Sequence, residues 1–186
     1  MKIAILGWGS LIWKPDNLAY NVEFDWSLNG PILPLEFSRV SNDGRLTLVI
    51  TDEGTDVTTL FTMSVFDTLK QSIINLAIRE CSSIANIGFY EKKNKQFSPS
   101  NFKYQKNIEN WIEQNNSIDA VIWTNLSENW RTKLNVKDRI KYLLSLNNSE
   151  SEIAEEYIRK TPTQIKTQLR EEIESKLNWK SIENNL

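Results

Sequence analysis

Glu80 is the residue whose type and position most directly suggest chemistry. The stretch from Phe66 to Cys81 has a helical pattern, and one of its stripes consists of Leu69, Ile73, Leu76 and Glu80. A carboxylate at the end of an apolar stripe loses hydration, which favours proton uptake and suits a general acid/base near neutral pH. The alternative is that Glu80 lies in a frayed last turn and pairs with a nearby Lys or Arg. We expect the opposite stripe to face solvent; it consists of Thr68, Ser72, Asn75 and Arg79.

A glycine-containing loop is the second chemical feature. Gly7-Trp8-Gly9-Ser10-Leu11 follows the apolar run 2–6, and such a turn can present several backbone N–H groups to a carboxylate or phosphate. It is not a dinucleotide fingerprint, because Ile12 stands where the third glycine would be, and it lacks the Gly-Lys-Ser/Thr of a Walker loop. The alternative is a tight turn chosen for packing.

Missing residue types narrow the chemistry. The chain has no histidine, which excludes a Ser-His-Asp triad, a Cys-His pair and a histidine metal site. A proton shuttle must therefore be a carboxylate, Tyr, Lys or Cys. The single cysteine, Cys81, cannot form an internal disulfide, so a secreted disulfide framework is also excluded.

Length and charge indicate an ordinary globular protein. With 186 residues we expect a single domain over 1–186. A net charge of -2 gives no general attraction to nucleic acid or to an anionic membrane. The apolar N-terminus is broken by two glycines and Ser10, so we interpret it as a buried strand and loop rather than a signal peptide, and expect a cytoplasmic protein.

Periodicity predicts a mixed α+β fold. Strands are expected at 2–6, 33–39, 46–50, 57–66, 88–93 and 119–124. The strands on either side of the Asn42-Asp43-Gly44 turn should form a hairpin. Helices are expected at 66–81, around 104–111, at 136–144, and, after capping patterns that begin at Ser149 and Thr161, near 150–160 and 162–177.

The loop and the glutamate together resemble a known family. Gly7 to Trp13, combined with Arg79-Glu80, is similar to the γ-glutamylcyclotransferase-like superfamily, particularly its ChaC-type branch. Members carry a Tyr-Gly-Ser-Leu or Tyr-Gly-Ser-Asn loop after the first strand and an Arg-Glu pair at the end of the helix that bears the catalytic glutamate. The resemblance spans about residues 1–90, and the stretch 149–162 is more faintly similar to the late helix of the family.

The resemblance implies a small mixed β-barrel surrounded by helices, here with extra C-terminal helices. Glu80 would be the acid/base that cyclises a γ-glutamyl amine or peptide to 5-oxoproline, without metal or cofactor. The substrate-binding residues would be Gly7, Trp8, Gly9, Ser10, Leu11, Arg39, Tyr90 and Tyr157. Arg39 would pair a substrate carboxylate and the two tyrosines would supply hydroxyls; the alternatives are a surface arginine and two packing tyrosines.

The chain also departs from the family. Trp8 replaces the usual loop tyrosine, and the His-Arg-Gly-rich segment of ChaC proteins has no counterpart, the nearest region being 37–45. One rival hypothesis is therefore a non-catalytic module on the same scaffold that binds a small ligand or a protein. Another is a hydrolase that uses carboxylates alone, which needs a second acid close to Glu80.

Overall fold

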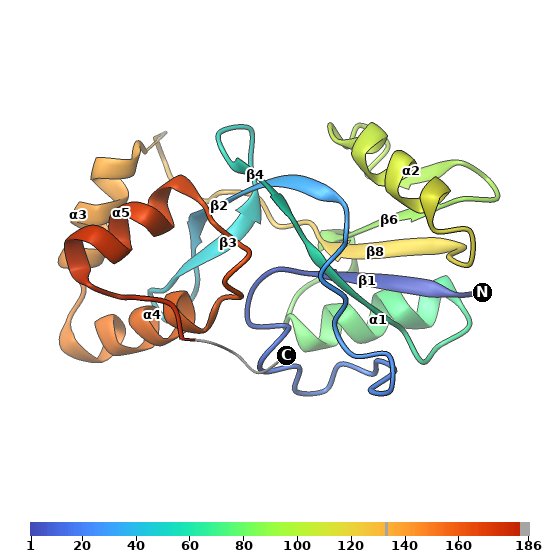
Figure 1. Cartoon of the computed structure of the whole chain (residues 1–186), viewed down its shortest axis with the longest axis horizontal. Helices are drawn as coiled ribbons and strands as arrows, with labels where there is room; N and C mark the ends of the chain where they lie inside the picture. Colours follow the sequence, from blue (N-terminus) through green and yellow to red (C-terminus); the bar gives the residue numbers. More distant parts are fainter. Residues whose placement is uncertain (133, 183–186) are drawn as a thin grey trace.

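A computed structural model describes residues 1–132 and 134–182, which form a mixed α+β structure (Figure 1), as predicted. In this part of the chain the strands are β1 (Ile3–Gly7), β2 (Ile32–Val40), β3 (Leu46–Ile50), β4 (Thr55–Thr58), β5 (Leu60–Met63), β6 (Ile87–Glu91), β7 (Gln96–Ser98) and β8 (Ala120–Thr124). The helices are α1 (Leu69–Arg79), the short 3-10 helix η1 (Ile84–Asn86), α2 (Gln105–Gln114), α3 (Val136–Leu144), α4 (Asn148–Lys160) and α5 (Gln168–Leu177). Among the described helices, none combines the length and the apolar character needed to cross a bilayer.

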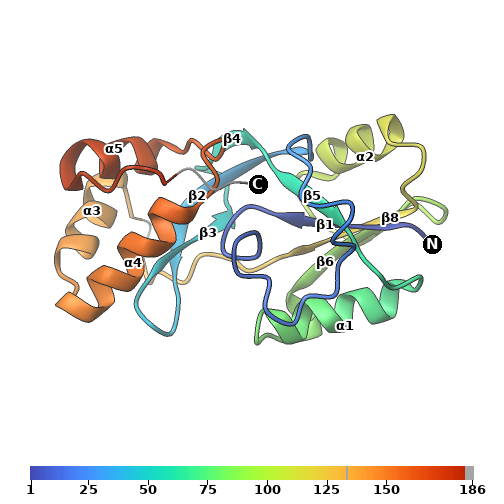
Figure 2. The same ribbon diagram turned by 60° about the horizontal axis from the view of Figure 1, so that its bottom comes forward.

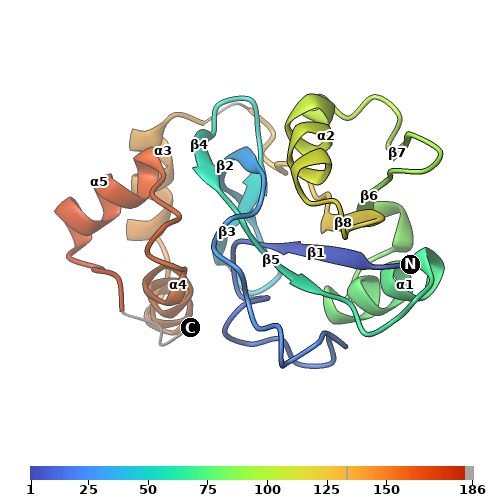
Figure 3. The ribbon, with the colours of Figure 1, turned by 45° about the vertical axis from the view of Figure 1, so that its right-hand side comes forward.

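The larger sheet has β1 and β8 at its centre. Its order is β5-β1-β8-β6-β7, and β1 runs parallel to β8, with Ile3 opposite Ala120 and Ile5 opposite Ile122. The other neighbouring strands are antiparallel. Helices α1 and α2 cover opposite faces of this sheet (Figures 1 and 3). Both central strands are therefore shielded on two sides, which explains their unbroken apolar runs and confirms their prediction as buried strands.

The smaller sheet has the order β3-β2-β4, and α3, α4 and α5 gather beside it (Figure 1). The predicted β2–β3 hairpin is confirmed, with Leu35 opposite Ile50. The single strand predicted over 57–66 is wrong, because β4 pairs in the small sheet and β5 in the large one. At the crossover, the buried Thr59 donates its hydroxyl (2.7 Å) and its N–H (3.2 Å) to the carbonyl of Pro31. The described strands thus form two sheets and no closed barrel, contrary to the expected barrel.

Helix α1 buries a side that the sequence pattern assigned to solvent. Ser72 is 1% exposed, and its hydroxyl lies 2.9 Å from that of Ser64. The amide oxygen of Asn75 accepts a hydrogen bond from the N–H of Ala19 at 2.8 Å, which ties the helix to the chain that follows β1. Ile78, in contrast, is 59% exposed. The predicted solvent-facing stripe is therefore wrong except at Thr68, which is exposed, because the N-terminal loop and Ser64 pack on the rest of it.

The C-terminal helices form, but they begin at other residues than the capping patterns predict. Asn147 caps α4 and Glu150 completes its capping box, two residues earlier than expected. Helix α5 begins at Gln168, where the side chain of Thr167 accepts a hydrogen bond from the N–H of Arg170. The helix expected directly after Thr161 is replaced by a turn.

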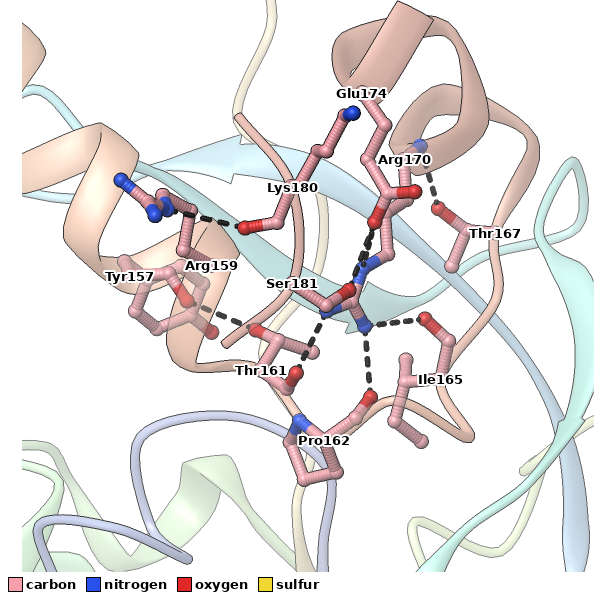
Figure 4. Close-up of polar contacts among 10 residues, drawn as sticks. All are labelled: Tyr157, Arg159, Thr161, Pro162, Ile165, Thr167, Arg170, Glu174, Lys180 and Ser181. Atoms are coloured by element: carbon pink, nitrogen blue, oxygen red, sulfur yellow. Dashed lines mark hydrogen bonds and ion pairs between the residues drawn. The ribbon is translucent and has the colours of Figure 1, made fainter. Parts of the chain in front are cut away.

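The guanidinium of Arg170 explains that turn (Figure 4). Arg170 is 2% exposed and donates to the carbonyl oxygens of Thr161 (2.7 Å), Pro162 (2.7 Å) and Ile165 (2.9 Å). Carbonyl oxygens that accept these bonds are directed at the arginine rather than along a helix axis. The Thr161 hydroxyl also donates to the carbonyl oxygen of Tyr157 at 3.0 Å, so this network holds the end of α4.

A buried carboxylate holds the start of α5. Glu36 on β2 is 1% exposed and accepts hydrogen bonds from the N–H groups of Leu169 (3.1 Å) and Phe37 (2.8 Å). Burial raises the pKa of Glu36, and this effect outweighs the hydrogen bonds from Thr167 and the backbone and the charge of Arg139. The carboxylate stands at the N-terminal end of the helix, where the helix dipole favours negative charge.

Candidate active site

A cavity of about 580 Å³ lies where the loop after β1, the β2–β3 hairpin, the end of α1 and helix α4 meet. Figure 2 shows that loop lying between α4 and α1. The cavity wall includes the segment 7–11, Arg39, Glu80 and Tyr157. Every predicted site residue except Tyr90 therefore lines one cavity, although the segments that carry them are far apart in the sequence.

Glu80 caps the C-terminal end of α1. Its N–H donates to the carbonyl of Leu76 at 2.9 Å, and the next residue, Cys81, has a positive φ of 47° that ends the helix. The Glu80 side chain is 17% exposed, and its Oε1 accepts a hydrogen bond from Nη1 of Arg79 at 2.6 Å. Among the described residues, no donor bonds to its other oxygen, Oε2. Arg79 thus holds one carboxylate oxygen, and the other has no hydrogen-bond donor in the described part of the chain.

Arg79 joins Glu80 to the glycine loop. While Nη1 holds Glu80, Nη2 donates to Oγ of Ser10 (3.2 Å) and to the carbonyl of Lys14 (2.7 Å). The Arg79 side chain is 8% exposed, and no described residue accepts a hydrogen bond from its buried Nε. Glu80 therefore both lines the cavity and pairs with a cation. Its interpretation as an acid/base and its interpretation as one half of an ion pair are compatible. The expectation that Arg79 faces solvent is wrong.

The loop after β1 leaves consecutive backbone donors unused. The N–H groups of Ile12 and Lys14 bond back to the carbonyls of Gly9 (3.1 Å) and Ser10 (2.9 Å), which closes a turn. Within the described part of the chain, the N–H groups of residues 8–11 donate to no protein oxygen. A run of free N–H groups in a cavity wall suits a carboxylate or phosphate group.

Gly9 and Tyr157 are in close contact. A Cβ atom on Gly9 would overlap the Tyr157 hydroxyl oxygen and lie 3.3 Å from its Cζ. The hydroxyl accepts a hydrogen bond from the N–H of Leu48 at 3.3 Å, and the Leu48 carbonyl accepts one from the Trp8 ring at 3.3 Å. Burial raises the pKa of Tyr157 to about 12. The hydroxyl therefore stays protonated near neutral pH and can donate its proton to a ligand.

Of two further predicted site residues, Arg39 lies in the cavity wall and Tyr90 lies in the core. Arg39 lines the cavity, and its Nη1 donates to the carbonyl of Ser127 at 2.7 Å. The β2–β3 register shifts between Phe37 and Arg39, so the alternation used to predict the direction of Arg39 is interrupted there. Tyr90 is 4% exposed and stacks on Phe97, with ring centroids 4.2 Å apart. Its predicted role in the pocket is wrong, because β6 turns this side chain into the core.

Sequence reasoning missed Arg45. Its guanidinium carbon lies 5.3 Å from the ring centroid of Tyr157, and its Nε donates to Asp43 at 2.9 Å. Arg45 comes directly after the turn of the β2–β3 hairpin and lines the cavity. No local pattern marks it as a site residue, because its contact with Tyr157 depends on α4 lying beside the hairpin.

Three other acids line the cavity: Asp16, Asp43 and Glu156. Burial opposes ionisation of Asp43, but hydrogen bonds from Arg45 and Ser41 outweigh it and lower the pKa of Asp43. Lys160 lowers the pKa of Glu156 through a hydrogen bond and its charge. A general acid in a carboxylate-only hydrolase needs a raised pKa. Neither Asp43 nor Glu156 suits that role, so the hydrolase hypothesis would have to draw its second carboxylate from Asp16.

No protein-family model, curated protein or solved structure matches this chain. Among residues 1–132 and 134–182, no three His, Cys, Asp or Glu side chains are grouped as a metal site requires. The residues of the cavity itself are therefore the basis for assigning a chemistry.

Proposed function

We propose that the protein is a γ-glutamylcyclotransferase-like enzyme, which converts a small γ-glutamyl amine, amino acid or peptide into 5-oxoproline and the free amine. One observation carries this proposal: Glu80 and the glycine loop line the same cavity, and Arg79 contacts both, at 2.6 Å from Glu80 and 3.2 Å from Ser10. A proton-transferring carboxylate opposite a row of backbone donors is the combination that this reaction needs.

The substrate is held through its γ-glutamyl half. The free N–H groups of residues 8–11 bind its α-carboxylate, as they form a concentrated patch of positive partial charge. A cavity of about 580 Å³ lies within the size range of small-molecule sites. It is large enough for the γ-glutamyl group and a further amino acid.

The reaction is an intramolecular aminolysis. Glu80 takes a proton from the α-ammonium group of the substrate, and the resulting amine attacks the γ-carbonyl carbon. A new C–N bond closes the lactam ring while the original amide C–N bond breaks, and Glu80 returns the proton to the departing nitrogen. The ring nitrogen then loses its second proton, which the released amine takes up to become an ammonium group. Holding the substrate in a folded conformation supplies much of the rate gain of such a ring closure.

Tyr157 and Arg79 support this step in different ways. Because its pKa is raised to about 12, the Tyr157 hydroxyl keeps its proton and can donate it to the carbonyl oxygen as negative charge develops there. Arg79 orients Glu80 by holding Oε1, which leaves Oε2 for the proton transfer. Both roles require the short contacts between α1, α4 and the loop.

Release of 5-oxoproline from glutathione and a panel of γ-glutamyl amines and amino acids tests the proposal. Glu80→Gln keeps the size of the side chain but removes the proton acceptor, so we expect kcat to fall by about 10²- to 10⁴-fold. Glu171→Gln is a matched control, because Glu171 is exposed on α5 and lies outside the cavity wall. Full turnover by Glu80→Gln, or no product from the wild type with any substrate, would refute the proposal.

One feature favours a non-catalytic binding module as the second candidate. The ion pair between Arg79 and Glu80 has a structural use of its own, since it anchors the loop through Ser10 and Lys14. Trp8 also lacks the hydroxyl of the usual family tyrosine. Thermal stabilisation by a γ-glutamyl compound that is recovered unchanged would support this candidate over the enzyme.

A further inference from the structure

Arg45 is one of three arginines that line the cavity, and like Arg39 it comes from the β2–β3 hairpin rather than from α1. It immediately precedes β3, and its N-terminal neighbours form the hairpin turn, in which the N–H of Ser41 donates to the Arg45 carbonyl at 2.9 Å. The side chain is 27% exposed and lies over the ring of Tyr157 at 5.3 Å. Contacts with the Tyr157 ring and with Asp43 hold the guanidinium at the cavity wall.

Most of the donors of Arg45 are unused. Its Nε bonds to Asp43 at 2.9 Å, and among the described residues no oxygen accepts from Nη1 or Nη2. Arg39, on the neighbouring strand, lines the same cavity, and within residues 1–132 and 134–182 it donates through Nη1 alone, to the carbonyl of Ser127. A planar guanidinium with two free terminal nitrogens matches the two oxygens of a carboxylate.

The acids on this side of the cavity do not compete for those donors. Asp43 accepts from the Nε of Arg45 and from the hydroxyl of Ser41, at 2.9 and 2.5 Å. Glu156 accepts from Lys160 at 2.6 Å. The hairpin wall of the cavity therefore presents cationic donors that suit an anionic group of the ligand.

We propose that Arg45 determines substrate specificity by binding a carboxylate on the part of the substrate that leaves. This proposal rests on the proposed cyclotransferase function. The γ-glutamyl half uses the loop amides and Glu80, so the anion bound by Arg45 belongs to the other half. The substrates are then γ-glutamyl amino acids or peptides with a free carboxylate, in preference to γ-glutamyl amines that have none.

Two matched substrates test this specificity. γ-Glutamyl-alanine and γ-glutamyl-alaninamide differ only in a carboxylate against a neutral amide. We expect the wild-type kcat/KM for 5-oxoproline release to be about ten- to a hundredfold higher for the acid, the range given by hydrogen bonds to a charged group. Arg45→Gln should lower kcat/KM for the acid about ten- to a hundredfold more than for the amide, so that the variant no longer prefers the acid.

Two further variants separate recognition from folding. Arg45→Lys retains the charge without the fork and should give an intermediate preference, while Arg131→Gln, an exposed arginine outside the cavity wall, should behave as wild type. Equal wild-type kcat/KM for the two substrates, or a loss in Arg45→Gln that is the same for both, would overturn the inference.

Binding measurements distinguish this inference from the function on which it rests. If the wild type forms no 5-oxoproline, the enzyme proposal fails. Calorimetric titration of the wild type and of Arg45→Gln with both compounds then still measures whether Arg45 binds the carboxylate. If the wild type binds γ-glutamyl-alanine more tightly than γ-glutamyl-alaninamide, and Arg45→Gln abolishes this difference, the result supports carboxylate recognition without catalysis. Equal binding of the two compounds to the wild type overturns it.

Discussion

Replacing Gly9 by alanine tests the contact between the loop and α4. Gly9 does not have a left-handed φ, so its backbone is compatible with alanine and the effect is steric. The new Cβ would overlap the Tyr157 hydroxyl oxygen, which must move by about 1 Å to reach van der Waals contact. The hydrogen bond from the Leu48 N–H, 3.3 Å long, does not tolerate such a shift in either direction.

The magnitude follows from these two effects. Overpacking a well-packed site costs about 1–3 kcal/mol, and loss of one buried hydrogen bond adds about 0.5–1.5 kcal/mol. We therefore expect Gly9→Ala to lower the free energy of unfolding by about 2–4 kcal/mol, measured by urea denaturation. If Tyr157 donates to the substrate, kcat/KM for 5-oxoproline release should fall as well.

A double-mutant cycle isolates the clash. Tyr157→Phe removes the oxygen that the new methyl group would meet, whereas the ring carbon Cζ stays at 3.3 Å. The double variant Gly9→Ala/Tyr157→Phe should therefore be about as stable as Tyr157→Phe alone, with a coupling of about 2–4 kcal/mol, the full cost of Gly9→Ala. A Gly9→Ala protein within about 0.5 kcal/mol of wild type, or strictly additive costs, would refute the proposed contact.

Two further predictions concern the buried charged side chains of Glu36 and Arg79. Burial raises the folded-state pKa of Glu36 above its unfolded value of 4.5. The contribution of Glu36 to the free energy of unfolding is therefore fully present below pH 4.5, and it is lost as the pH rises through the raised pKa. The stability difference between wild type and Glu36→Gln in urea denaturation should thus shrink with rising pH; a difference that grows would contradict this sign. Arg79→Met should lower the free energy of unfolding by about 1.5–3 kcal/mol and reduce 5-oxoproline release, because Glu80, Ser10 and Lys14 lose a shared donor. Arg79→Lys, which keeps the charge, should be intermediate, and wild-type activity in both variants would exclude a positioning role.

Local periodicity predicted the elements whose own residues form an amphipathic pattern or a continuous apolar run. The apolar runs of β1 and β8 and the hairpin of β2 and β3 formed as expected, since alternation and turn residues act over a few positions. Capping patterns were less successful, because Arg170 draws the carbonyls of Thr161, Pro162 and Ile165 to itself. A side chain from the next helix thus overrides a local signal.

Long-range contacts also explain the missed sheet boundary. The apolar run 57–66 is continuous in sequence, yet it divides between two sheets where Thr59 bonds to Pro31. Periodicity cannot show which strands pair, and it therefore cannot distinguish a closed barrel from two sheets.

By itself, the sequence determined a helix that ends at an acid, a glycine loop after a buried strand, and a chemistry without histidine. Only the tertiary structure decided that the loop and Glu80 share a cavity, that Arg79 faces inward to link them, and that Tyr90 lies in the core instead. The physical reason is that the period of a helix or strand tells which side is apolar, whereas the partners of its polar side chains depend on which distant segments pack against it.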